Sequence, residues 1–215
     1  MPDWAEITRQ LGVQNDMPTP VSGGDISAAW RLGKYFLKTG PLAYLDMYSA
    51  EAEGLGALAA TNTVRVPSVI GFGEVGEASF IALQWLDLTS ADAATEAIFG
   101  EQLASLHRCS NERYGWHRDN PIGLTPQPNA WSDDWVAFLR ERRLGNQLRR
   151  AAGNGFTGEL QQKGARLLKR LPYFFDESSC VPSLLHGDLW GGNWAASGGE
   201  PVMFDPVAKI DSRIE

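Results

Sequence analysis

The fold of this chain is decided by the stretch His186-Gly187-Asp188-Leu189-Trp190-Gly191-Gly192-Asn193 and by Phe204-Asp205-Pro206, which follows after a short apolar run. Together they set out a carboxylate at Asp188, an amide five residues later at Asn193, and a second carboxylate at Asp205. The glycines between the first two groups let the backbone turn sharply. The order of these three side chains is the strongest chemical signal in the sequence.

A hairpin is expected between the amide and the second carboxylate. Residues 194–197 and 202–205 have the character of two short strands, and Gly198-Gly199-Glu200-Pro201 between them is a turn signal. Such a hairpin would fold Asp205 back beside Asn193. Both side chains could then face one metal ion.

This order is typical of kinase-like phosphotransferases, which use a catalytic Asp, a Mg²⁺-binding Asn and a Mg²⁺-binding Asp. A γ-phosphoryl group in transfer carries dispersed negative charge, so the protein mainly has to hold metal ions and reactants in line. Asp188 would accept a proton from a substrate hydroxyl, while Asn193 and Asp205 would offer oxygen ligands to Mg²⁺. Either motif alone is common in ordinary loops, and the prediction rests on their order with a hairpin between them.

The string HGDLWGGN with FDP downstream resembles the fructosamine kinase (ketosamine-3-kinase) family, within the broader aminoglycoside phosphotransferase and choline kinase-like group. Leu189-Trp190 after HGD points to the ketosamine branch. The resemblance implies ATP-dependent 3-phosphorylation of ketosamines, such as fructosamine or ribulosamine adducts on amines or lysine side chains, with ATP and Mg²⁺ as cofactors. The phosphorylated product would then decompose and free the amine.

The resemblance also implies the fold, which is an α+β, bilobal protein kinase-like fold. Residues 1–86 are expected to form an N-lobe with an N-terminal helix, a glycine-rich loop, a small antiparallel sheet and one long helix. Residues 87–215 are expected to form a partial, mostly helical C-lobe with the catalytic and metal-binding loops. Local patterns agree, because 4–11 has helical periodicity with Asp3 as a possible N-cap, and 28–32 and 35–39 suit a hairpin turning at Gly33-Lys34.

Nucleotide phosphates are expected to meet the N-lobe. Gly23 and Gly24 would let backbone N–H groups approach phosphate oxygens, although the segment lacks a full GxGxxG pattern. Lys38 ends a strand from which it could reach the α- and β-phosphates. The helix expected at 43–60 carries Glu51 and Glu53, which point in different directions, so only one can pair with Lys38. The surrounding string, which resembles the family's helix, favours Glu51, and Glu53 is the alternative.

The remaining binding residues are expected on either side of the phosphates. An apolar strand at 80–86 ends where the backbone of Gln84, Trp85 and Leu86 could hydrogen-bond the adenine edge. On the acceptor side, Trp190 offers an aromatic face that could stack on a sugar ring or could instead be core. His186 is the second candidate for substrate contact.

The expected C-lobe begins with a helix that Ser90 could cap and that runs to about residue 107. Residues 111–130 are too polar and interrupted for regular structure, and the family resemblance implies that they lie near the acceptor. A long amphipathic helix is expected at 131–150, with Ser132 as N-cap, and its arginines are best explained as a solvated face. A further helix at 158–171 and a buried strand at 183–185 would follow.

Composition narrows the class of protein. The chain has 215 residues, 43% of them hydrophobic, which is enough for a core in one domain or two small lobes. The net charge of −7 argues against nucleic acid and suits a cationic amine-bearing substrate. Cys109 and Cys180 lie in no disulfide or zinc pattern. No apolar run is long enough for a membrane helix and the N-terminus lacks signal-peptide features, so a cytoplasmic protein with no membrane partner is expected.

The C-terminus departs from the family pattern. The resemblance runs from about Trp4 to Pro206 and is then expected to fail, because family members continue with further helices. The chain is therefore expected to be C-terminally truncated, with an uncovered C-lobe surface that could drive self-association. Two other functions stay open: an aminoglycoside- or choline-type phosphotransferase, and a non-catalytic nucleotide-binding module.

Overall fold

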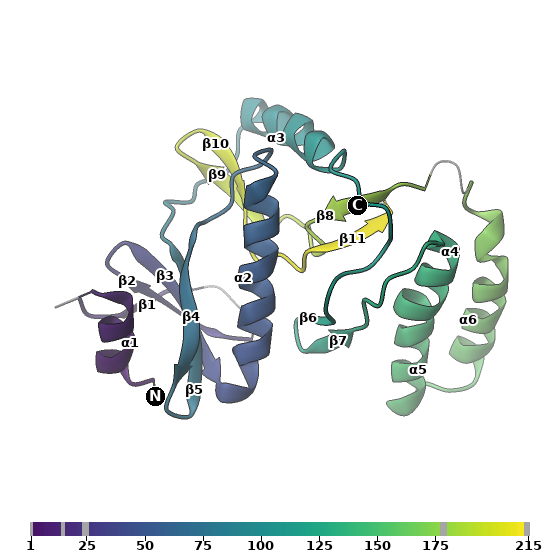
Figure 1. Ribbon diagram of the computed structural model, residues 1–215, viewed down its shortest axis with the longest axis horizontal. Helices are drawn as coiled ribbons and strands as arrows, with labels where there is room; N and C mark the ends of the chain where they lie inside the picture. Colours follow the sequence, from purple (N-terminus) through teal and green to yellow (C-terminus); the bar gives the residue numbers. More distant parts are fainter. Residues whose placement is uncertain (1, 14–15, 23–25, 177–179, 213–215) are drawn as a thin grey trace. The chain divides into compact units, whose positions relative to one another are not determined.

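The computed structural model describes residues 2–13, 16–22, 26–176 and 180–212 (Figure 1). Contacts divide the chain into two compact units, each treated separately below. Unit 1 comprises Met1–Leu106 and His186–Ala208, and unit 2 comprises His107–Leu185 and Lys209–Glu215. The lobe boundary expected after residue 86 stays a prediction. All residues of the HGDLWGGN and FDP motifs fall in unit 1.

A five-stranded antiparallel sheet forms the centre of unit 1. Its order is β1-β2-β3-β5-β4. The strands are β1 (Thr19–Pro20), β2 (Ala28–Leu32), β3 (Tyr35–Pro41), β4 (Val69–Val75) and β5 (Ala78–Gln84). The expected β2–β3 hairpin is confirmed, with Leu32 paired to Tyr35 across Gly33-Lys34. Gly33 has φ +56°, a left-handed conformation that a residue without Cβ adopts at little cost.

Helices cover both faces of this sheet. The first, α1 (Trp4–Leu11), has the expected bounds, and the Asp3 side chain accepts a hydrogen bond from the Glu6 N–H. The second, α2 (Leu45–Ala60), follows a 3₁₀ turn, η1 (Leu42–Tyr44), so the helix expected from residue 43 begins with a tighter turn. Figure 1 shows α2 lying along β4 and β5.

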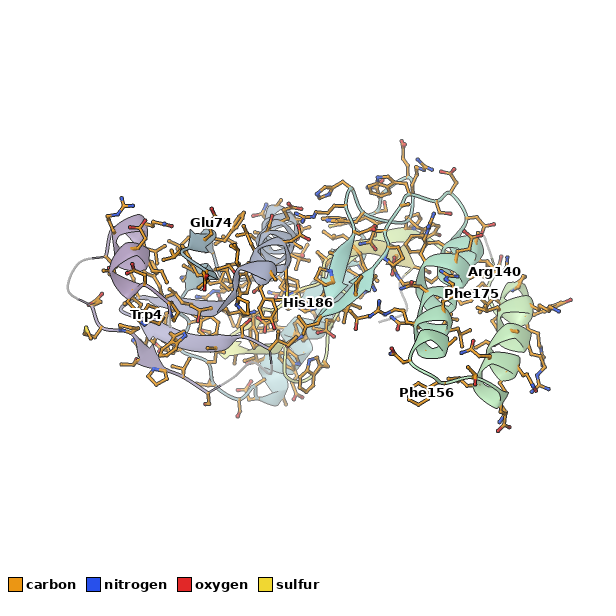
Figure 2. All side chains as sticks on the ribbon, turned by 90° about the horizontal axis from the view of Figure 1, so that it is seen from below. Trp4, Glu74, Arg140, Phe156, Phe175 and His186 are labelled. Carbon is orange, nitrogen blue, oxygen red and sulfur yellow. The ribbon has the colours of Figure 1, made fainter. Side chains whose placement is uncertain are left out.

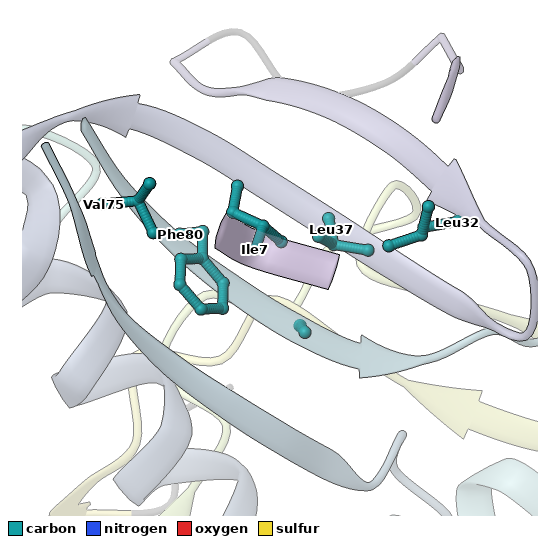
Figure 3. Close-up of a cluster of buried hydrophobic side chains, with 6 residues drawn as sticks. Ile7, Leu32, Leu37, Val75 and Phe80 are labelled. Carbon is teal, nitrogen blue, oxygen red and sulfur yellow. The ribbon is translucent and has the colours of Figure 1, made fainter. Parts of the chain in front are cut away.

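Successive side chains along β3 and β5 point to opposite faces of the sheet, one covered by α1 and the other by α2. Leu37 of β3 and Phe80 of β5 pack with Ile7 of α1 in one cluster (Figure 3). Ile81, the next residue of β5, packs instead in a cluster with residues of α2. Because successive strand residues point to opposite faces, Lys38 lies on the α2 side of the sheet.

The remainder of unit 1 brings together distant parts of the chain. It comprises α3 (Ala93–Leu106), β9 (Trp194–Ser197) and β10 (Glu200–Met203). The Phe99 ring on α3 stacks on the Trp194 ring at 4.3 Å between centroids. The Ser90 cap was wrong, because Asp92 directly precedes α3 and accepts a hydrogen bond from the Thr95 N–H at 2.8 Å.

Unit 2 contains helices and two small antiparallel pairs of strands. Its elements are β6 (Asn120–Ile122), β7 (Thr125–Gln127), α4 (Trp135–Phe138), the π-helical η2 (Leu139–Leu144), α5 (Gly145–Gly153), α6 (Glu159–Arg170), the 3₁₀ turn η3 (Leu171–Tyr173), β8 (Pro182–Leu185) and β11 (Lys209–Ser212). Phe156 lies at the turn between α5 and α6 and points away from both (Figure 2).

Three expectations for unit 2 need correction. Residues 111–130 are not wholly irregular, since β6 and β7 form a hairpin. The helix expected at 131–150 begins at Trp135, and its N-cap is Asp134, which accepts from the Ala137 N–H at 2.8 Å, rather than Ser132. Arg143 is not on a solvated face, because its guanidinium forms a buried ion pair with Asp211 at 3.0 Å.

Among the described residues, no helix combines the length and the apolar character that crossing a bilayer requires.

Candidate active site

Lys38 joins two parts of unit 1 that are far apart in sequence. Its Nζ lies 2.8 Å from Glu51 Oε1 and 2.5 Å from Asp205 Oδ1. The side chains of Lys38 and Glu51 are only 13% and 10% exposed, whereas that of Asp205 is 39% exposed. Of the two glutamates considered on α2, Glu51 makes the pair, while Glu53 Oε1 lies 3.5 Å from the Ser49 hydroxyl.

This triad carries one positive and two negative charges. Burial alone would lower the pKa of Lys38, but the Glu51 and Asp205 carboxylates outweigh it and raise the pKa well above its ordinary value. Burial raises the pKa of Glu51, and the Asp205 charge adds to this against the pull of Lys38. The excess negative charge would favour a cation beside Asp205, the more exposed carboxylate.

A short loop holds Asp188 and Asn193 together. Asn193 Nδ2 donates to the Asp188 backbone oxygen at 2.8 Å and to Asp188 Oδ2 at 3.1 Å. The Asn193 N–H also donates to the Trp190 carbonyl at 2.9 Å, which closes the loop. Because Nδ2 is directed at Asp188, the Asn193 amide oxygen is directed away from it and can serve as a ligand.

The expected hairpin between Asn193 and Asp205 is present. Strands β9 and β10 pair antiparallel from Met203↔Trp194 to Glu200↔Ser197, so β10 begins earlier than expected and the turn is the pair Gly198-Gly199. Both glycines have positive φ, +65° and +82°, which suits a tight two-residue hairpin turn.

The far end of the hairpin sets the position of Asp205. The Phe204 N–H donates to the Asn193 carbonyl at 3.0 Å, which extends the pairing by one step. Asp205 then adopts φ +57°, a left-handed conformation that is uncommon for any residue other than glycine. Backbone strain of this kind is concentrated at functional sites, and here it accompanies the turn of the Asp205 carboxylate towards Lys38.

His186 connects the two loops from beneath. Its ring is fully buried, at 0% exposure. Nε2 lies 2.9 Å from the Phe204 carbonyl oxygen, and Nδ1 accepts from the Asp188 N–H at 3.3 Å. A ring buried in this way is not accessible to a sugar substrate, so the geometry favours a positioning role over the expected substrate contact. Residue type and spacing alone could not distinguish these roles.

Trp190 is exposed rather than part of the core. Its side chain is among the large hydrophobic groups at the surface, at 64% exposure. The ring lies over Gly192, because a Cβ built on Gly192 would collide with Cη2 and Cζ2 of the indole. A glycine there allows the ring to lie against the backbone four residues beyond Asp188.

The segment expected to meet adenine begins at the last residue of β5. The Gln84 N–H donates to the Ser68 carbonyl at 2.8 Å, and the Trp85 N–H donates to the Lys34 carbonyl at 2.9 Å. These two donors are engaged, which leaves Leu86 as the candidate donor to an adenine edge. Gly23 and Gly24 lie outside the described residues.

Sequence reasoning missed a hollow of about 450 Å³ in unit 1. Its lining combines the segment after Leu86 with the start of α3 and with residues around Asn193. These lining residues are Leu88, Thr89, Ser90, Ala91, Glu96, Gly191, Trp194 and Ala195. Apart from Gly191, these residues belong to no motif identified in the sequence, because the lining comes from three separate segments.

The donor set is compatible with a hard cation. The described part of the chain contains no group of three or more His, Cys, Asp or Glu side chains arranged to hold a metal ion. A carboxylate at Asp205 and an amide oxygen at Asn193 are ligands that Mg²⁺ accepts, and Mg²⁺ commonly completes its shell with water and substrate phosphates.

Comparison with known sequences finds similarity to kinases of ketosamines. A sequence model described as fructosamine kinase matches residues 3–211, so the similarity continues past Pro206, where it was expected to fail. A probable ketoamine kinase from Synechocystis is 38% identical over 219 residues, which cover 95% of this chain and 72% of the relative. A chloroplastic protein-ribulosamine 3-kinase from Arabidopsis thaliana is 37% identical over 195 residues, which cover 87% of this chain and 60% of the relative.

Solved structures confirm the expected fold class. An inferred fructosamine-3-kinase from Haemophilus somnus has a TM-score of 0.85 at 27% identity, over 99% of this chain and 73% of that one. A mutant aminoglycoside phosphotransferase, solved with ADP and hygromycin B, has a TM-score of 0.66 at 14% identity, over 97% of this chain and 72% of that one. The second likeness shows the fold alone, which is α+β and protein kinase-like.

Proposed function

Because this chain belongs to the fructosamine kinase family, we propose that it transfers the γ-phosphoryl group of ATP to a sugar hydroxyl of a ketosamine. The names of its relatives supply the acceptor class, since they are ketoamine and protein-ribulosamine kinases. The acceptor would be a fructosamine or ribulosamine, either as a small molecule or on a glycated lysine, and the 3-hydroxyl would be phosphorylated. Subsequent breakdown of the product would free the amine.

One observation carries the phosphotransferase proposal. The Lys38 ammonium is hydrogen-bonded to both Glu51 and Asp205, and the latter lies 167 residues away in sequence. A structural ion pair needs only one carboxylate. The second carboxylate belongs to the FDP motif and is linked through the β9–β10 hairpin to Asn193 and Asp188. The groups proposed to bind phosphate and to act in catalysis all belong to unit 1.

Asp188 is the proposed catalytic base. Asn193 Nδ2 holds Asp188 Oδ2 at 3.1 Å, so the orientation of the carboxylate is restricted. Asp188 accepts the proton of the acceptor hydroxyl as the sugar oxygen forms a bond to the γ-phosphorus, and the bond between that phosphorus and the ADP oxygen breaks. Lys38 binds phosphate oxygens and stabilises their charge, while Glu51 fixes the ammonium.

The donor set fits Mg²⁺, and Asn193 Oδ1 with the Asp205 carboxylate would hold it. When bound, the ion would neutralise charge that develops on the phosphate oxygens. The Asp205 carboxylate forms a hydrogen-bonded ion pair with Lys38 in this structure, so it would be shared between the ammonium and the metal. Leu86 would donate to adenine, and Gly23 and Gly24 would approach the phosphates.

Two further residues have proposed roles near Asp188. Trp190 presents an exposed indole face on which a sugar ring could stack. His186 keeps the Asp188 and Asp205 loops in register through its two ring nitrogens. Neither role requires the side chain to take part in proton transfer.

The proposal is tested by coupling ADP release to a spectroscopic readout, with Mg²⁺-ATP and a fructosyl- or ribulosyl-lysine derivative. Asp188→Asn should lower turnover by roughly 10² to 10⁴. Asp133→Asn is a matched control, because that side chain is 80% exposed and lies in unit 2. Turnover with an aminoglycoside or choline but not with ketosamines would change the acceptor class. ATP binding without turnover of any acceptor would instead indicate a nucleotide-binding module.

A further inference from the structure

A second side-chain hydrogen bond joins α2 to the hairpin that carries Lys38. The hydroxyl oxygens of Tyr48, on α2, and Ser27, directly before β2, lie 2.8 Å apart. Tyr48 is fully buried, at 0% exposure, and precedes Glu51 by three residues on the same face of α2. One helix face therefore holds the β2–β3 hairpin at two points, Ser27 and Lys38.

A glycine provides the space for this bond. Gly40 lies in β3, in the part of the strand that faces the start of β2. A Cβ built on Gly40 would lie 3.1 Å from the Tyr48 hydroxyl and would collide with the Tyr44 ring. The missing side chain at Gly40 lets the Tyr48 hydroxyl lie close to the sheet and reach Ser27.

The protonation state of Tyr48 and its separation from Ser27 in sequence suit a stable hydrogen bond between two elements. Burial raises the pKa of Tyr48, so the phenol is protonated at neutral pH and can donate to the Ser27 oxygen. The two residues are 21 positions apart, so the bond fixes one element against another rather than completing a local turn. Near the same end of β2, the Val21 N–H donates to the Ala29 carbonyl at 3.0 Å.

We propose that Tyr48 is a positioning residue for nucleotide binding: by holding Ser27, it fixes the β2–β3 hairpin against α2 and so sets where the Lys38 ammonium meets phosphate oxygens. This inference rests on the proposed function. Its particular claim is that the Tyr48 hydroxyl acts on phosphates through Lys38 and leaves recognition of the nucleoside unchanged.

The test measures the affinities of ATP and adenosine by calorimetry for the full chain and for Tyr48→Phe, Ser27→Ala and the double variant. Tyr48→Phe should weaken ATP binding by about 2- to 12-fold, the range of one neutral hydrogen bond, and change adenosine affinity less than about twofold. Ser27→Ala should have the same effect, and the double variant should resemble either single variant, because both remove one bond. Tyr44→Phe is the matched control, and it should change neither affinity.

Three results would overturn the inference: unchanged ATP affinity in Tyr48→Phe, equal weakening of ATP and adenosine, or additive effects in the double variant. Melting temperatures give the folded fraction of each variant at the assay temperature, and the affinities of both ligands are corrected for it before they are compared. Turnover is measured separately. A wild-type chain that binds ATP but phosphorylates no ketosamine would contradict the proposed function, while the binding comparison would still decide the role of Tyr48.

Discussion

Replacing Glu51 by Gln would remove one negative charge from the Lys38 triad while keeping the size of the side chain and its ability to accept a hydrogen bond. Glu51 Oε1 is 2.8 Å from Lys38 Nζ, and both side chains are largely buried. With Glu51 uncharged, Asp205 is the remaining anion beside Lys38 and should attract the ammonium more strongly. Lys38 would then be less well placed for phosphates, and Asp205 less available to Mg²⁺.

The size of the effect follows from the kind of hydrogen bond that is changed. A hydrogen bond to a charged group contributes about 1.5–3 kcal/mol. The Lys38 ammonium stays charged in the variant while the acceptor becomes neutral, so the bond should fall from the upper towards the lower end of that range, a loss of about 1–1.5 kcal/mol. If that loss is expressed in nucleotide binding, the KM for Mg²⁺-ATP should rise about 5- to 12-fold. Glu53→Gln makes the same chemical change two residues further along α2 and should leave this KM near its wild-type value.

The pH dependence of the KM for ATP gives a second test of the role of the Glu51 charge. Burial raises the pKa of Glu51, so this carboxyl takes up its proton at a higher pH than an ordinary glutamate. As pH falls through that pKa, the wild-type KM for ATP should rise towards the value of Glu51→Gln. The variant has no proton to gain at this position and should lack that part of the pH dependence.

Stability should respond differently from affinity. A raised folded-state pKa means that the folded protein holds the Glu51 proton more tightly, so this contribution to stability is present below the unfolded pKa and is lost as pH rises through the folded one. Gln avoids that loss but interacts less strongly with Lys38, so the unfolding free energy should change by less than about 1 kcal/mol. Equal KM values for the Glu51 and Glu53 variants, measured by steady-state kinetics, would refute this reasoning.

Three further changes test other parts of the structure. Asp205→Ala should remove productive binding of Mg²⁺-ATP with the fold intact, and a Mg²⁺ titration that matches wild type would contradict the ligand role. Gly192→Ala places a Cβ against the Trp190 ring and should raise the KM for ketosamine without raising that for ATP; equal effects on both substrates would argue against sugar stacking. Arg143→Met leaves the buried Asp211 carboxylate with only the longer ion pair to Lys209, at 4.0 Å, and should lower the unfolding free energy by up to about 3–5 kcal/mol, measured by urea titration.

Elements governed by neighbouring residues could be predicted from the sequence. The hairpin at Gly33-Lys34 and the helix capped by Asp3 depend on turn and capping rules that act over a few positions. The hairpin between Asn193 and Asp205 was predicted for the same reason. The β10 boundary was misplaced because Glu200 and Pro201 were assigned to the turn, although two glycines with positive φ are sufficient for it.

Errors in helix caps had a single cause. Ser90 and Ser132 are good capping residues, but each lies two positions before an aspartate that directly precedes the helix. Asp92 and Asp134 accept the N-terminal N–H hydrogen bonds instead. Two good capping residues within three positions leave the start of a helix ambiguous by one or two residues.

Long-range partners could not be inferred from local pattern. Strand β11 is a strand because Lys209–Ser212 pairs with β8, far earlier in the chain. Arg143 belongs to a charged stretch that suggests solvent exposure, yet Asp211 neutralises it in the interior of unit 2. The choice of Glu51 over Glu53 rested partly on family resemblance, and the structure places Glu51 beside Lys38.

The discontinuous make-up of unit 1 has a consequence for synthesis on the ribosome. Residues 1–106 emerge first, but the hairpin and the Asp205 carboxylate that complete the unit arrive only after residues 107–185 have been translated. Until then the nascent Lys38 has Glu51 as a partner but not Asp205, and the surface of α3 that later packs against β10 is bare. Pausing of translation between residues 106 and 186 should therefore prolong an aggregation-prone intermediate.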